Sequence, residues 1–172
     1  MIKTFALLTC VSFLTGCVTT QNMKPSEPLL ENEGIVVTTC KTPNAINRVV
    51  SVIPADYKHT FGDIPPHVSC SQEGKLAVIK LEAGDYHTGE TKNFNVYKHL
   101  PSFTVQPNKI NYIGDLRIAV SETNLMVGLL VGFQQPKISF SVVDERQETL
   151  QQLRDERPDI ADNYKMVVDI AK

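Results

Sequence analysis

Short apolar runs separated by turn residues dominate the chain from residue 34 onward. The runs are rich in β-branched and aromatic side chains, which favour strands, and Pro, Asn and Gly mark the breaks between them. The pattern predicts strands at residues 34–40, 46–53, 75–81, 92–98, 110–121 and 137–143. Strands at this spacing predict a mainly β domain, an antiparallel β-sandwich over residues 34–172, rather than alternating β and α units.

A helix is predicted near the C-terminus, over residues 145–157. Asp144 stands at the N-cap position, Leu150 and Leu153 are expected to face the core, and Pro158 is expected to end the helix.

Two other segments allow more than one interpretation. Residues 125–133 (LMVGLLVGF) are too few to span a bilayer as a helix, which needs about 20 apolar residues. A buried strand is expected there, and a partner-binding patch is the alternative. Apolar residues alternate in the tail, 164–171, which fits a final strand or a short helix.

The start of the chain has the features of an export signal. Lys3 precedes an apolar run from Phe5 to Leu14, which suits a signal peptide but is too short for a transmembrane helix. Residues 18–33 are polar, show no periodicity and contain two prolines, which predicts a flexible tether spanning about 20–25 Å as a coil.

The sequence Leu14-Thr15-Gly16-Cys17 resembles the lipobox of bacterial lipoproteins. The resemblance implies that residues 1–16 are removed, that Cys17 is acylated, and that residues 17–33 form a lipidated tether. Two or more acyl chains hold a protein stably, so the membrane is an expected partner. Val18 replaces the aspartate that commonly retains lipoproteins in the inner membrane, which points to the periplasmic face of an outer membrane. The inner membrane, a single cell membrane, or a plain signal peptide with an incidental cysteine are the alternatives.

Net charge indicates which partners to expect, and the cysteine content predicts a disulfide. The formal net charge is −2 without a basic block, so no nucleic-acid partner is expected. Beyond the leader and Cys17, the remaining cysteines are Cys40 and Cys70, and in an exported chain they predict one disulfide. A zinc site that adds His67 to these two cysteines is the alternative, although the spacing matches no common ligand pattern.

No local motif of a nucleophile, phosphate loop, dinucleotide site or metal cluster is found, and no catalytic residue, metal or cofactor is assigned. The richest loop is YKHTFGDIPPHVSC, in which Tyr57, His59, Asp63 and His67 form a possible binding loop. A proline-stiffened connection closed by the disulfide is the plainer interpretation.

Two stretches carry a second resemblance. The sequence KLEAGDY (80–86) resembles the turn into a strand of carboxypeptidase-regulatory-like and transthyretin-like β-sandwiches, with Ala83 in place of the more usual proline. Residues 103–114 are similar to the later strand pair of small uncharacterised lipoproteins with that sandwich. The resemblance implies that Gly84 supplies the turn and that Tyr86 and Tyr112 bury their rings. It implies no activity.

These observations predict a lipid-anchored envelope protein that acts as a non-catalytic binding or scaffolding module and faces the periplasm, with an envelope protein or polymer as partner. The alternatives are a periplasm-facing enzyme whose site is assembled from distant residues, and an accessory lipoprotein of a secretion assembly.

Overall fold

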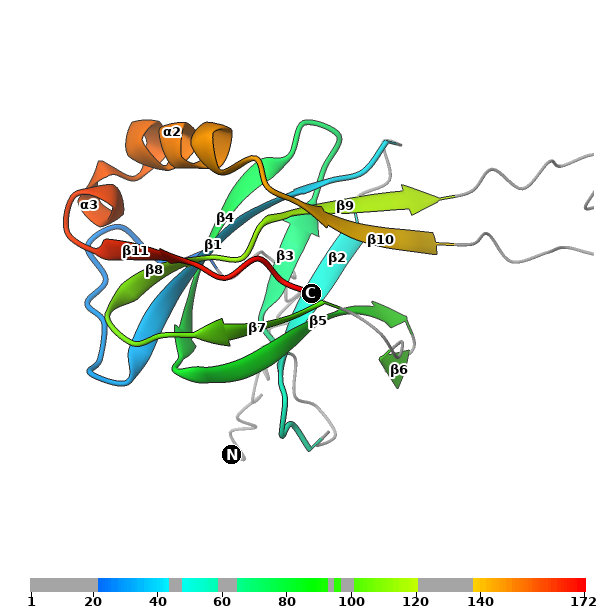
Figure 1. Cartoon of the computed structure of the whole chain (residues 1–172), viewed down its shortest axis with the longest axis horizontal. Coiled ribbons are helices and arrows are strands. Elements are labelled where there is room, and N and C mark those ends of the chain that lie inside the picture. Colours follow the sequence, from blue (N-terminus) through cyan, green and yellow to red (C-terminus); the bar gives the residue numbers. More distant parts are fainter. Residues whose placement is uncertain (1–21, 44–47, 59–64, 93–94, 97–100, 121–137) are drawn as a thin grey trace, which may run out of the picture.

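A computed structural model describes residues 22–43, 48–58, 65–92, 95–96, 101–120 and 138–172 of the chain. The fold is mainly β, with one mixed sheet, one antiparallel sheet and short helices near the C-terminus (Figure 1).

The mixed sheet, sheet A, is built around β1, which pairs with neighbours on both of its edges. β4 runs antiparallel along one edge, and β8 followed by β9 runs parallel along the other. β10 pairs antiparallel with β9, and β11 pairs parallel with β8. The strands of sheet A are β1 (Glu33–Lys41), β4 (Lys75–Glu82), β8 (Lys109–Tyr112), β9 (Asp115–Val120), β10 (Ile138–Val143) and β11 (Lys165–Val168). The expectation of a wholly antiparallel arrangement is therefore wrong for this sheet.

The second sheet, sheet B, is antiparallel, with β5 at its centre between β2 on one side and β6 and β7 on the other. Its strands are β2 (Arg48–Pro54), β3 (His67–Cys70), β5 (Gly84–Lys92), β6 (Asn95–Val96) and β7 (Ser102–Val105). The predicted disulfide is present and joins the sheets, because Cys40 lies in β1 and Cys70 in β3.

Two apolar clusters hold the layers together. The larger one contains side chains from both sheets, among them Val36 of β1 and Val52 of β2. The smaller one joins sheet A to the helices α2 (Arg146–Glu156) and α3 (Pro158–Ala161), where Leu153 and Ile160 are buried. β1 is buried on both faces because its successive side chains alternate between these two clusters. This explains why its sequence is almost continuously apolar.

Most of the predicted elements are observed, with informative differences. Strands at 34–40, 46–53, 75–81 and 137–143 correspond to β1, β2, β4 and β10, and the tail contains the strand β11. The predicted strand 110–121 is broken into β8 and β9 at Gly114, whose φ is +89°. The predicted strand 92–98 is also wrong in its bounds, since β5 runs to Lys92 and β6 covers only Asn95–Val96. The pattern of apolar runs did not predict β3, β5 and β7, because their sequences are polar or short. The resemblances at residues 80–86 and 103–114 did imply strands where β5 and β7 lie.

Helix α2 confirms the predicted helix with two local corrections. The cap residue is Glu145 rather than Asp144, although Asp144 Oδ1 accepts the Arg146 N–H at 3.3 Å. Pro158 starts α3 instead of simply ending α2, because proline is well suited to the first turn of a helix. The apolar segment 125–133 lies outside the described residues.

Residues 22–33 differ from the expected flexible tether, because they lie against the domain. Met23 is 5% exposed and belongs to the cluster between sheet A and the helices, and Leu29 packs against the same cluster. The remainder of the expected tether, residues 17–21, lies outside the described residues.

Candidate functional site

A buried polar cluster lies where β1, the β8–β9 break and α2 meet. At its centre is Asp115, whose side chain has no exposed surface. Asp115 Oδ1 accepts hydrogen bonds from Thr39 N at 3.1 Å, Thr39 Oγ1 at 2.6 Å and Thr149 Oγ1 at 2.7 Å. Asp115 Oδ2 accepts hydrogen bonds from Tyr112 Oη at 2.5 Å and Glu145 N at 3.3 Å. A buried carboxylate is stable only when its lone pairs are satisfied in this way.

The sequence folds locally to make this cluster possible. Gly114 turns the chain between β8 and β9, so that Tyr112 and Asp115 end up on the same side and close together. The Tyr112 hydroxyl also accepts the Glu145 N–H at 3.0 Å, at the start of α2. Burial raises the pKa of Tyr112, and the hydrogen bond to Asp115 adds to the shift. The phenol therefore remains a proton donor over the physiological pH range.

Charged side chains stand at the rim of the cluster. Glu145 forms an ion pair with Arg117 of β9, and its Oε2 lies 3.6 Å from Lys41 Nζ. All three side chains are about a quarter to a third exposed, so these pairs contribute modestly to stability. The cluster has its donors and acceptors paired with one another, which makes it a support that fixes α2 on sheet A.

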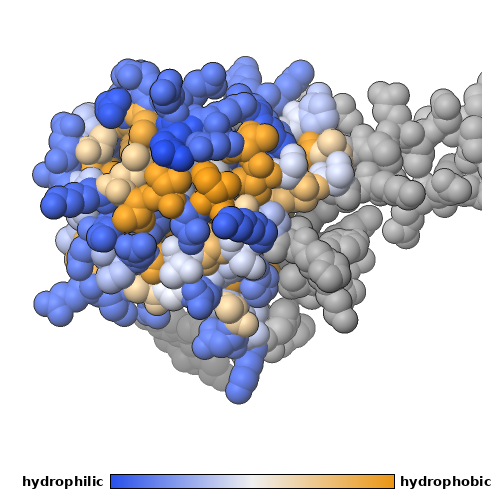
Figure 2. All heavy atoms as spheres, viewed as in Figure 1, coloured by the Kyte–Doolittle hydropathy of each residue, from blue (hydrophilic) through white to orange (hydrophobic). Residues whose placement is uncertain are grey.

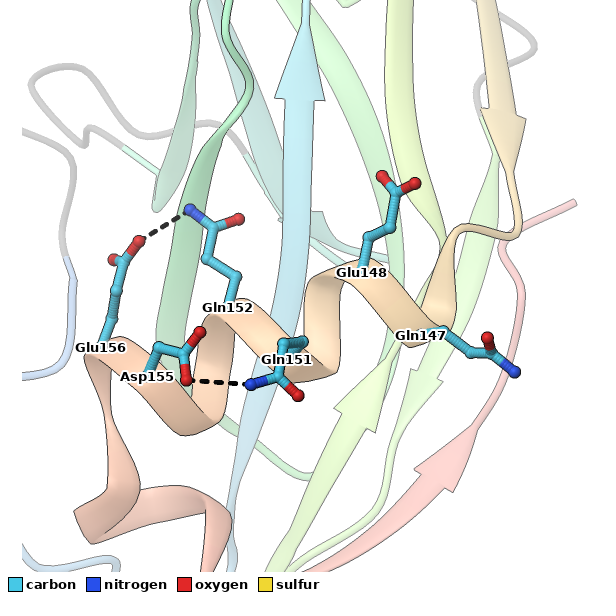
Figure 3. Close-up of a pocket in the computed structure, with 6 residues that line it drawn as sticks. All are labelled: Gln147, Glu148, Gln151, Gln152, Asp155 and Glu156. Atoms are coloured by element: carbon cyan, nitrogen blue, oxygen red, sulfur yellow. Dashed lines mark hydrogen bonds between the residues drawn. The ribbon is translucent and has the colours of Figure 1, made fainter.

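A shallow depression of about 530 Å³ lies on the outer side of α2 (Figure 3). Its lining comes from this helix alone: Gln147, Glu148, Gln151, Gln152, Asp155 and Glu156. Two pairs within it are hydrogen-bonded along the helix, Gln151 to Asp155 at 2.9 Å and Gln152 to Glu156 at 2.7 Å. Side chains paired with their own helix neighbours are typical of a solvated helix face.

The possible binding loop is only partly described. Tyr57 is half-buried after β2, and His67 opens β3 with 4% of its surface exposed. Because His67 pairs with Ser51 in the strand ladder, it belongs to sheet B rather than to an open loop. His59 and Asp63 lie outside the described residues, as does Cys17. Cys40 and Cys70 are joined to each other, so the alternative zinc site with His67 is excluded in this structure.

Within the described part of the chain, no three His, Cys, Asp or Glu side chains come together as a metal site. No helix among those residues is long and apolar enough to cross a membrane.

An exposed strand edge is the second candidate. β10 stands at the end of the strand order of sheet A and contains no charged residue. Ser139 and Ser141 are exposed, whereas Phe140 and Val142 are half-buried and pack against the core. Figure 2 shows apolar surface gathered over the region that Figure 1 assigns to β10 and β11. The apolar residues of these elements that retain exposed surface include Phe140, Val142, Val143, Val167 and Val168.

The other strands at the edges of the two sheets are shorter, charged or covered. β3 and β7 have four residues each, and Ser102 of β7 exchanges two backbone hydrogen bonds with Lys172. β11 also has four residues and carries Lys165. β4 carries Lys80, and residues 22 and 23 cover its outer edge through two hydrogen bonds to the backbone of Val78. Charges and short lengths protect natural sheet edges from pairing with other chains. Among the described strands, β10 is the long edge that lacks such protection.

Sequence reasoning did not identify Asp115, Thr39 or Thr149 as a cluster. An aspartate between two apolar strand segments, in Tyr-Ile-Gly-Asp-Leu, was the available signal, since buried charges need specific partners. Comparisons with protein-family models and with curated proteins find no match for this chain.

Proposed function

We propose that the protein is a lipid-anchored, non-catalytic envelope module whose β-sandwich domain binds an extended segment of an envelope protein along β10. The anchor is Cys17, and the domain faces the periplasm from the outer membrane. The uncharged edge of β10 is the observation that carries the binding proposal. An added strand would gain backbone hydrogen bonds there, and the half-exposed apolar side chains beside it would supply contacts for alternate residues of the partner.

The buried cluster around Asp115 is shielded from solvent and internally hydrogen-bonded, which supports a non-catalytic role. Each oxygen of Asp115 already accepts at least two hydrogen bonds, and the carboxylate is shielded from solvent. A general acid or base must reach the proton it transfers. The hydrogen-bond partners of Asp115 are all groups of the surrounding strands and helix start: Thr39, Tyr112, Thr149 and the Glu145 N–H.

Site-specific photo-crosslinking in intact cells tests the binding surface. A photoreactive amino acid in place of Ser141 is expected to give a crosslinked product with one envelope protein. The same group in place of Gln151, which is also exposed but lies on α2, serves as the matched control and is expected to give none. Adding Ser139→Lys to the Ser141 probe should abolish the product, because a charge on the edge strand disfavours strand addition. Products of equal yield at both positions, or a product insensitive to Ser139→Lys, would contradict the proposal.

The anchor has a separate test. Cys17→Ser is expected to leave an uncleaved precursor that takes up no labelled palmitate, because the acylated thiol is missing. Palmitate incorporation into this variant would refute the assignment of Cys17.

A further inference from the structure

The segment 22–33 enters the domain at the outer edge of β4. Met23 N donates a 2.7 Å hydrogen bond to Val78 O, and Val78 N donates a 3.0 Å hydrogen bond to the side-chain oxygen of Asn22. These two bonds satisfy backbone groups of an edge strand, as an added strand would do. The Met23 side chain is buried between sheet A and the helices.

Arg157, between α2 and α3, holds the same part of the segment. Its Nη1 donates to Met23 O at 2.7 Å and its Nη2 donates to Lys24 O at 3.3 Å. The guanidinium is oriented by two 2.9 Å hydrogen bonds to Asp159, whose Oδ2 also accepts the Ser26 N–H at 3.3 Å. Because Arg157 is bound to a carboxylate and to two backbone carbonyls at once, it fixes the chain path rather than only a local charge.

Lys80 holds the second half of the segment. Its ammonium lies 2.7 Å from Glu27 Oε1 and 3.5 Å from Glu33 Oε2. The hydrogen bond from Lys80 lowers the pKa of Glu27, and that from Arg157 lowers the pKa of Asp159, so both carboxylates are charged at neutral pH. The segment is thus fixed to the domain by apolar burial at one point and by charged contacts at two.

We propose that residues 22–33 form a docked stalk that holds the β4 edge of sheet A close to the bilayer and leaves the β10 edge accessible. This inference rests on the proposed anchor at Cys17. Only the chain from Cys17 to Asn22 then separates the lipid from the domain, and five residues reach about 18 Å at most.

β4 and β10 lie on opposite sides of β1 in sheet A, with β9 between β1 and β10. Three strand spacings put the two edges about 14 Å apart. The partner of β10 therefore binds a domain whose distance from the bilayer and orientation are both restricted, in contrast to a domain that moves freely on a long tether.

Energy transfer on the acylated, full-length protein tests the stalk. The protein is placed in vesicles of phosphatidylethanolamine and phosphatidylglycerol that contain an acceptor lipid, with a donor dye at position 151. The wild type is expected to show high transfer and a narrow distance distribution. The double variant Arg157→Gln/Lys80→Gln should release the stalk, which lowers the transfer and broadens the distribution. Arg154→Gln/Lys75→Gln removes two exposed charges outside the stalk contacts and should behave as the wild type.

Hydrogen exchange on the same full-length chain separates the stalk from the anchor. The amides of Met23 and Ser26 donate hydrogen bonds from the stalk to Val78 O and Asp159 Oδ2 of the domain, so they should exchange slowly in the wild type and rapidly in the release variant. Rapid exchange in the wild type, or a wild-type distance distribution as broad as that of the release variant, would overturn the stalk. Slow exchange in a protein that neither takes up palmitate nor binds the vesicles would instead refute the anchor, and with it the role of the stalk at a membrane.

Discussion

The Tyr112 hydroxyl donates a 2.5 Å hydrogen bond to Asp115 Oδ2, and neither residue has exposed surface. The two residues end β8 and begin β9, so their bond spans the break in the sheet. Both also accept a hydrogen bond from Glu145 N, which lies at the start of α2. One buried pair therefore couples the shape of sheet A to the position of the helix.

Asp115→Asn is expected to lower the free energy of unfolding by about 2–4 kcal/mol, because an amide cannot accept all the hydrogen bonds that the carboxylate accepts. Equilibrium denaturation measures the change. Asp144→Asn is the matched control: Asp144 is exposed and pairs with Arg146, whose side chain is 40% exposed, so its loss should cost less than about 1 kcal/mol. Equal effects of the two substitutions would show that the Asp115 cluster is not a major support.

Stability should fall at alkaline pH through Tyr112. Burial raises its pKa above the ordinary value of about 10, so the unfolded phenol ionises at lower pH than the folded one. The resulting stabilisation is complete below about pH 10 and decreases as the pH rises further. Denaturation of the wild type and of Tyr112→Phe, measured from pH 8 to 11, should show a stability difference that shrinks above pH 10. A difference that stays constant over this range would contradict the prediction.

The disulfide should stabilise the fold by restricting the unfolded chain. Cys40 and Cys70 are separated by 30 residues, for which the chain-entropy model gives about 3.7 kcal/mol. Cys40→Ala/Cys70→Ala is expected to lower the free energy of unfolding by about that amount, and thiol reagents should label neither cysteine in the unfolded protein until a reductant is added. Full labelling without reductant would rule out the bridge in the isolated protein.

Gly114→Ala should be more harmful than Gly84→Ala. Both glycines have positive φ, +89° and +154°, but a Cβ on Gly114 would clash with Val142 Cγ1, whereas nothing lies within 4 Å of one on Gly84. We expect a loss of more than about 3 kcal/mol at Gly114, from backbone conformation and overpacking together, and of about 1–2 kcal/mol at Gly84. Thermal or chemical denaturation measures both, and a smaller loss at Gly114 than at Gly84 would be inconsistent with the close packing of β10 on the turn.

The elements that the sequence predicts well are those whose apolar residues follow a clear local pattern. β1 and β4 are apolar because both of their faces are covered, and α2 has its apolar residues at helical spacing. The pattern of apolar runs missed β5 because its sequence, GDYHTGETK, lacks the β-branched content of a predicted strand, and only the resemblance at residues 80–86 implied a strand there. Its pairing with β2 and β7 compensates for this weak local preference.

The sequence by itself determined the strand-rich composition, the C-terminal helix and the pairing of two cysteines, because these follow from local periodicity and from the count of thiols. Only the tertiary structure decided the parallel pairing of β1 with β8, the Asp115 cluster and the docking of residues 22–33. Arg157 and Met23 are 134 residues apart in the chain, and Thr39 and Asp115 are 76 apart. Contacts at such separations depend on how the layers pack, and no local pattern of apolar and polar residues encodes them.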